Sequence, residues 1–170
     1  MARTLELDAI IQRLQNLPKW NIYRVLVDGT TQPWYEVDGR ICADLVIRED
    51  QLVAQIEQLP IHILQWGRLT AQAKRVWEIA ERHYRVWRDS RSLQIMEEAV
   101  GAGEKRPTKE FVDQTVRADP EYTKYYIEQE RAEEAYNAAS AVLEGFRAKK
   151  DLLRTFAIRY QEQGSPRLSI

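Results

Sequence analysis

Two long segments of the chain carry apolar residues at helical spacing and almost no helix-breaking residues. Residues 61–100 contain no proline and one glycine, Gly67, and residues 120–163 are interrupted only by Gly145. Proline stops or kinks a helix and glycine weakens it, so such long uninterrupted segments favour helix. The pattern predicts a mainly α fold in which two long helices, joined by a connector and a short helix, lie antiparallel.

Local signals place the ends of these helices. Asp119 can cap a helix whose first residue is Pro120, because proline already has helical φ and needs no hydrogen-bond acceptor there. Thr108 is a comparable cap for a short helix, and Pro60 is expected to end another. The short helices are predicted over residues 4–17, 49–59 and 108–118.

The N-terminal part has a different composition. Residues 20–27 and 34–37 are rich in β-branched and aromatic side chains, and each run closes at an Asp-Gly pair. This pattern predicts a small β-hairpin-like segment near the N-terminus, which must pack on something else because two strands alone are marginal. The predicted division is an N-terminal segment over 1–48, a helical domain over 49–163 and a flexible tail over 164–170.

The last long helix repeats apolar residues every three or four positions for more than five heptads. Such a repeat favours packing along a helical partner with left-handed geometry. We expect this face to form an oligomer interface. Its central residues are Tyr136, Ala139, Leu143, Phe146 and Leu153.

Charge is balanced overall but unevenly placed. Lys plus Arg number 25 and Asp plus Glu number 26, which excludes a globally basic nucleic-acid binder. On the central helix, however, Arg68, Arg75 and Arg82 recur every seven residues, and more arginines follow. This row could track a phosphate backbone, although a solvated helix face is an equally good explanation. The candidate DNA contacts are Lys74, Arg75, Arg82, Arg85, Arg88 and Arg91.

The opposite face of the central helix is aromatic. Trp66, Trp77 and Tyr84 share one stripe with Ala73 and Ala80. Aromatic residues beside cations could stack nucleobases. The alanines in the stripe favour a packed core face instead.

Recognisable catalytic chemistry is missing from the sequence. The only cysteine is Cys42 and there are two histidines, without a metal-binding or nucleophile motif around them. We therefore expect no enzymatic activity, no metal and no cofactor. No apolar run is long enough to span a membrane, and the N-terminus lacks a signal-peptide pattern, so a cytoplasmic protein is expected.

Two stretches resemble the UvsY recombination mediators of T-even-type phages. The first is Asp44-Leu-Val-Ile47 with Leu52 and Trp66, at the head of the basic helix. The second is Val116-Arg-Ala-Asp-Pro-Glu-Tyr-Thr-Lys124, followed by Val142-Leu-Glu-Gly-Phe-Arg147 and a basic tail. The resemblance covers roughly residues 44–160.

This resemblance implies a non-enzymatic protein that binds single-stranded DNA and forms a ring-like homo-oligomer. Such a protein helps to load a RecA-type recombinase onto DNA coated by single-strand-binding protein, in the cytoplasm of a host cell. The family's basic pair corresponds to Arg88-Asp-Ser-Arg91, which lacks the two tyrosines that follow it in the family. The alternative is a phage structural or assembly adaptor that uses the heptad helix to bind another protein.

Overall fold

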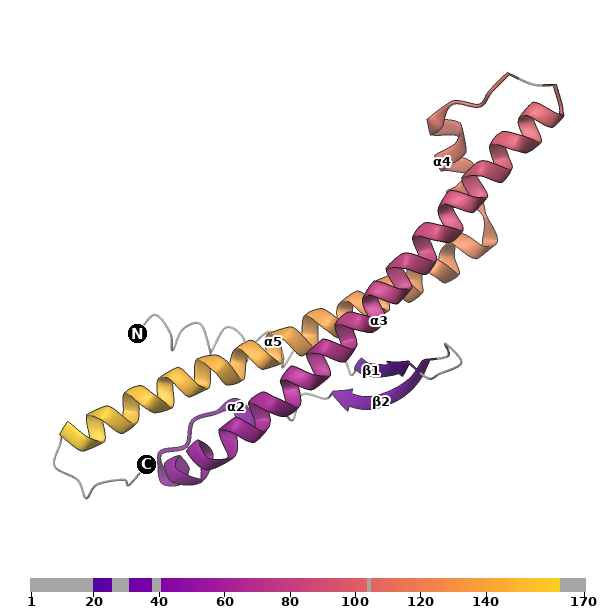
Figure 1. The fold of residues 1–170 in the computed structure, drawn as a ribbon. Helices are drawn as coiled ribbons and strands as arrows, with labels where there is room; N and C mark the ends of the chain where they lie inside the picture. The colour runs from indigo at the N-terminus through magenta and orange to yellow at the C-terminus, as the bar shows by residue number, and fades with distance from the viewer. Residues whose placement is uncertain (1–19, 26–30, 38–40, 104, 163–170) are drawn as a thin grey trace. The chain divides into compact units, whose positions relative to one another are not determined.

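A computed structural model describes residues 20–25, 31–37, 41–103 and 105–162. The described part is dominated by two long helices, α3 and α5 (Figure 1). The predicted mainly α class is therefore confirmed. The helix predicted over 4–17 and the predicted tail over 164–170 lie outside the described residues.

Four α-helices and one short 3-10 helix follow each other along the described chain. Their bounds are α2 Ile41–Leu45, η1 Glu49–Gln51, α3 Leu52–Gly101, α4 Lys109–Ala118 and α5 Pro120–Glu162. The break after α3 includes Gly103, whose φ of 75° lies in the left-handed region that glycine adopts without strain. The predicted boundaries of α4 and α5 agree with the structure to within about one residue.

Pro60 does not end a helix, which corrects the prediction of separate helices over 49–59 and 61–100. It lies inside α3, and its side chain is exposed. Proline removes one backbone hydrogen bond and crowds the preceding turn. Here Leu59 and Trp66 on either side of it are buried, and that packing holds the helix together through the proline.

Both helix caps that the sequence predicts are formed. The backbone N–H of Phe111 donates to Thr108 Oγ1 at 3.3 Å, and the N–H of Glu121 donates to Asp119 Oδ1 at 2.9 Å. Each cap supplies an acceptor to one of the unpaired N–H groups that begin a helix. These short-range contacts set the starts of α4 and α5.

Two short strands precede the helices. β1 (Trp20–Val25) pairs antiparallel with β2 (Thr31–Val37), and the register shifts between Ile22 and Tyr23. Residues 26–30, which connect the strands, lie outside the described part, so the complete β-hairpin-like segment is not established. Ile22 is fully buried and belongs to the main hydrophobic core.

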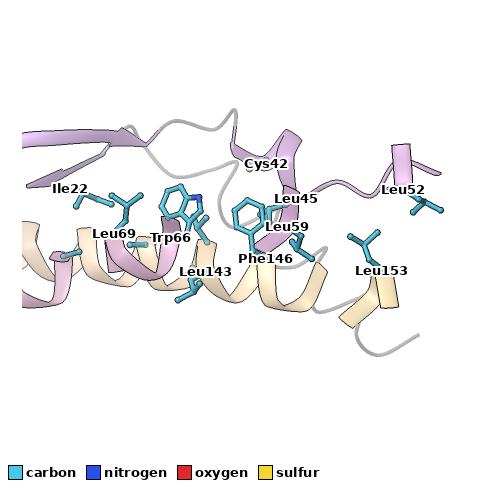
Figure 2. Packing of buried hydrophobic residues seen from close by; sticks show 14 residues of the cluster. Ile22, Cys42, Leu45, Leu52, Leu59, Trp66, Leu69, Leu143, Phe146 and Leu153 are labelled. Carbon is cyan, nitrogen blue, oxygen red and sulfur yellow. The ribbon is translucent and has the colours of Figure 1, made fainter. Parts of the chain in front are cut away.

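The chain forms two compact units, 1–73 with 135–170 and 74–134. In the first unit the N-terminal part of α3 packs against the C-terminal part of α5. Along the row in Figure 2, Leu69, Trp66 and Leu59 descend in number on α3 while Leu143 and Phe146 ascend on α5. The two segments are therefore antiparallel in this unit.

The core of the first unit contains all five residues predicted to form an oligomer interface. Ala139 and Phe146 are fully buried, Leu143 and Leu153 are at most 7% exposed, and Tyr136 packs against the same cluster. The partner of this apolar face within the chain is α3 together with α2 and β1. The heptad pattern thus predicted a packed face correctly, and an interface with another chain at these residues stays a prediction.

The second unit has its own small core. Ile95 of α3 packs with Val112 and Val116 of α4, and Trp87 and Tyr122 cover the cluster. Both valines lie on the apolar face of α4, so this short helix is held by its amphipathic pattern. The second unit also contains all six candidate DNA contacts.

Candidate nucleic-acid interface

Arg75 and Arg82 are the clearest cations of the predicted row. Both side chains are exposed on α3. Within the described part of the chain, no carboxylate lies within 4.0 Å of either guanidinium. Seven residues of helix separate them by about 10 Å. Two unneutralised guanidinium groups on one side of a helix can accept a polyanion without first breaking an ion pair.

Lys74 and Arg85 lie beside this pair but each contacts an acid one helical turn away. Lys74 Nζ is 3.8 Å from Glu78, and Arg85 Nη2 is 2.6 Å from Glu81. The lysine is 53% exposed and the arginine 61%. Exposed pairs of this kind contribute only about 0.3–0.5 kcal/mol, so a phosphate can compete for either cation.

Arg88 is also exposed, and its guanidinium lies 3.2 Å from the carboxylate of its neighbour Asp89. Both side chains are solvated, at 48% and 61% exposure. This contact is again weak. Arg88 therefore remains available to solvent, although its charge is partly offset by Asp89.

Arg91 has a different environment from the other candidates. Its Nε donates to Asp119 Oδ2 at 2.8 Å, and the two side chains are only 29% and 14% exposed. A second carboxylate, that of Glu98, lies 3.6 Å from Nη1. This arginine connects α3 to the residue that caps α5, so its structural role is sufficient to explain it.

Helical geometry explains why Arg91 differs. At 100° per residue, Arg75 and Arg82 lie about 160–180° from Trp66, which points into the first core. Arg91 lies about 20° from the direction of Trp66, on the packed side of the helix. From Arg82 onward the arginines recur every third residue, so their direction rotates around α3 from the solvent side at Arg82 to the packed side at Arg91.

Five aromatic side chains form a cluster between α3 and α5 in the second unit. Trp87 stacks on Tyr125 with centroids 5.2 Å apart, and Tyr122 stacks on Tyr126 at 5.5 Å. Tyr84 meets both Tyr122 and Tyr126 edge to face at 6.1 Å. Because these rings contact each other, they serve mainly to pack the two helices.

Polar atoms of the cluster are also engaged. Trp87 Nε1 donates to Glu121 at 3.2 Å. Burial raises the pKa of Tyr84, and a hydrogen bond with Tyr122 adds to the effect. A hydrogen bond to Glu130 raises the pKa of Tyr126, which is 38% exposed. Tyr84 and Tyr126 are therefore neutral at physiological pH and do not repel a phosphate.

The stripe that begins at Trp66 is a core face over its first part. Trp66, Ala73 and Ala80 are at most 6% exposed. Trp77 and Tyr84 are intermediate in exposure. Packing rather than base stacking thus accounts for the buried members, as their alternation with alanine indicates.

The first unit contains a buried cation that was not predicted from the sequence, Lys149. Lys149 is 4% exposed and donates through Nζ to the carbonyl oxygens of Asp44, at 2.6 Å, and Val46, at 3.3 Å. It lines a recess of about 130 Å³ with Arg48 and His62, among other residues. Lys149 follows the core residue Phe146 by three positions, which places both on the same side of α5. This spacing is the sequence signal that indicates a buried lysine.

Burial governs the ionisation of this lysine. Desolvation lowers the pKa of Lys149, and the nearby charge of Arg48 lowers it further, while Asp44 acts in the opposite direction. The two carbonyl groups satisfy two of its three donors. Lys149 thus tethers α2 to α5 and is a poor candidate for a phosphate contact at the surface.

Two further findings limit the chemistry of the described residues. No three of their His, Cys, Asp or Glu side chains lie close enough together to hold a metal ion. None of the helices that the structure describes has a stretch long and apolar enough to cross a membrane.

Comparison with known proteins returns no similar family model, no curated protein and no solved structure.

Proposed function

We propose that this chain is a non-enzymatic protein that binds single-stranded DNA and acts as a recombination mediator. In this role it would self-associate and help to load a RecA-type recombinase onto DNA that carries single-strand-binding protein. The proposal joins the resemblance to UvsY-type mediators with the surface of α3.

One observation carries the proposal. Arg75 and Arg82 are exposed on the same side of α3, and no described carboxylate neutralises them. Arg85 lies one turn beyond, in an ion pair that solvent already weakens. From Arg75 to Arg85 the row extends about 15 Å along the helix, long enough to contact several successive phosphates. We take these three arginines as the central contacts.

The other predicted contacts receive a lower rank from their surroundings. Lys74 and Arg88 flank the row, and each has an acid nearby. Arg91 is paired with Asp119, so we do not include it among the proposed DNA contacts. This ranking differs from the resemblance, which would place the DNA-contacting pair at Arg88 and Arg91.

A short row of cations on a nearly neutral chain should bind DNA weakly through one copy. Self-association would place several rows on one strand, and linked binding raises the apparent affinity by a factor of about 100 or more. Each phosphate contact releases counterions, so the affinity should fall with salt by a log–log slope of about −0.7 per contact.

A second candidate function is a structural or assembly adaptor. It is favoured by exposed apolar side chains on α3, where Ile61 and Leu64 are 66% and 65% exposed. In this alternative the arginines are solvated charges. The sequence suggests the heptad helix α5 as the binding surface, but its apolar face is buried, so the exposed apolar side chains of α3 would bind the other protein.

Salt-titrated binding of the full chain to labelled oligo-dT distinguishes the two functions. The mediator requires binding at low salt that weakens steeply as salt is added. An adaptor predicts negligible binding at every salt concentration.

A further inference from the structure

The first part of α3 is apolar on two opposite sides. Trp66 and Leu59 point into the core and are at most 5% exposed. On the other side, Val53, Ile61 and Leu64 are 48%, 66% and 65% exposed. Each apolar side of a helix normally packs against a neighbour. One side of α3 in the first unit therefore lacks a neighbour among the described residues.

This exposed side forms one stripe. With Leu64 as reference, all its members lie within about 60° around the helix, and Trp66 lies about 160° away. Gly67 borders the stripe, and a Cβ built on it would meet nothing within 4 Å. The stripe consists of Val53, Glu57, Pro60, Ile61, Leu64, Arg68 and Ala71, all of them exposed.

The two charges of the stripe are placed symmetrically about its apolar centre. Glu57 precedes Ile61 by four residues, and Arg68 follows Leu64 by four. The midpoint between 57 and 68 is also the midpoint between 61 and 64. Rotation by 180° about that point places Glu57 on Arg68 and Ile61 on Leu64. The stripe is therefore complementary to itself in an antiparallel arrangement.

We infer that this stripe binds a second copy of the same chain, with the two α3 segments antiparallel about a twofold axis between residues 62 and 63. Glu57 of each copy then faces Arg68 of the other, and Ile61 faces Leu64. A parallel pair would instead place like charges opposite each other, which is unfavourable. A twofold interface uses the same patch on both copies, so both ion pairs form at once.

This inference deepens the self-association that the proposed function requires, and it rests on that function only in this respect. In this inference the two copies contact each other through the exposed stripe on α3. The buried face around Phe146 on α5 is not part of the interface. The pairing concerns Glu57 and Arg68, neither of which is a proposed DNA contact. Its test contains no DNA, so it can fail while DNA binding holds, or hold while DNA binding fails.

The test is sedimentation equilibrium of the full chain up to about 100 µM, a range suited to a small interface. We expect a monomer–dimer equilibrium in the unmodified chain. Glu57→Arg and Arg68→Glu each place like charges together at two sites per dimer and should weaken dimerisation about tenfold or more. The double variant E57R/R68E restores opposite charges and should recover most of the affinity.

Controls separate the stripe from general effects. Glu144→Arg and Arg147→Glu make the same charge changes at exposed positions of α5 and should leave dimerisation unchanged. The variant I61D/L64D should be monomeric with unaltered helicity by circular dichroism, because both side chains are exposed. A monomeric unmodified chain overturns the inference, and so does a double charge reversal that dimerises no better than the single variants.

Discussion

Arg91 of α3 and Asp119 at the start of α5 form a charged hydrogen bond of 2.8 Å between Nε and Oδ2. The same carboxylate also accepts the backbone N–H of Glu121 through its other oxygen. Asp119 therefore caps α5 and fixes α3 beside it. One side chain serves both the local structure of α5 and the packing of the second unit.

Removal of this contact should destabilise the protein. Arg91→Ala leaves a carboxylate that is only 14% exposed without its cation, at an expected cost of about 1–3 kcal/mol. Asp119→Ala also removes the cap and should cost about 1 kcal/mol more. Urea unfolding of both single variants and the double variant measures the coupling between the residues.

Arg88→Ala is the matched control for Arg91. Its guanidinium contacts the exposed carboxylate of Asp89, so its replacement should change the free energy of unfolding by no more than about 0.5 kcal/mol. Equal losses for the two arginines would show that Arg91 has no special structural role.

Phe146→Ala tests whether the heptad face of α5 is a core within one chain. The Phe146 ring is fully buried and stacks on His62 with centroids 5.0 Å apart. Loss of this ring should cost about 3–5 kcal/mol, and the loss should not depend on protein concentration. Thermal unfolding over a hundredfold range of concentration provides the measurement.

Phe111→Ala is the corresponding control, since that ring is 56% exposed and should contribute little. If Phe146 packed against a second chain, the effect of its replacement would grow with concentration. That result would show that the face around Phe146 is the oligomer interface that the sequence predicts.

Lys149→Met tests the tether between α5 and α2. The methionine keeps most of the buried aliphatic chain but leaves the carbonyl groups of Asp44 and Val46 without their donor. We expect a loss of about 1–3 kcal/mol at neutral pH. Lys150→Met, at the exposed neighbouring position, should change stability by less than about 0.5 kcal/mol.

The same lysine predicts a pH dependence. Burial lowers the pKa of Lys149 below its ordinary value of 10.5. The folded chain then binds fewer protons than the unfolded chain between the two pKa values, so the contribution of Lys149 to stability rises with pH in that window. The difference in unfolding free energy between the unmodified chain and Lys149→Met should therefore grow as pH approaches 10. A constant or shrinking difference would contradict the assigned direction.

Local signals in the sequence predict much of the fold. Thr108 and Asp119 identify the starts of α4 and α5 because each cap involves residues only two or three positions away. The periodic face around Phe146 predicts a packed helix side because the apolar residues that form it are only three or four positions apart. The partner of that face is not local, and the sequence alone does not distinguish α3 of the same chain from a helix of another.

The features that sequence analysis missed depend on distant contacts. Pro60 is tolerated because buried neighbours hold α3 on both sides of it. Helical periodicity places Arg91 on the packed side of α3, but its partner there, Asp119, lies 28 positions later in the chain. Lys149 is buried by carbonyl groups more than 100 positions earlier. Periodicity indicates the side of a helix on which a residue lies, but not what meets it there.

The central claim is that Arg75, Arg82 and Arg85 bind a single DNA strand. Its most direct test compares oligo-dT affinity across a salt series for the full chain, for R75A/R82A/R85A and for R147A/K150A/R154A. The last variant removes three cations from exposed positions of α5 and controls for total charge.

We predict that the unmodified chain binds at low salt and that loss of the α3 arginines weakens binding. This loss should also flatten the log–log salt slope by about 2, at about 0.7 per contact. The α5 variant should retain both the affinity and the slope. Absence of binding in dilute buffer, or equal losses in the two variants, would contradict the account.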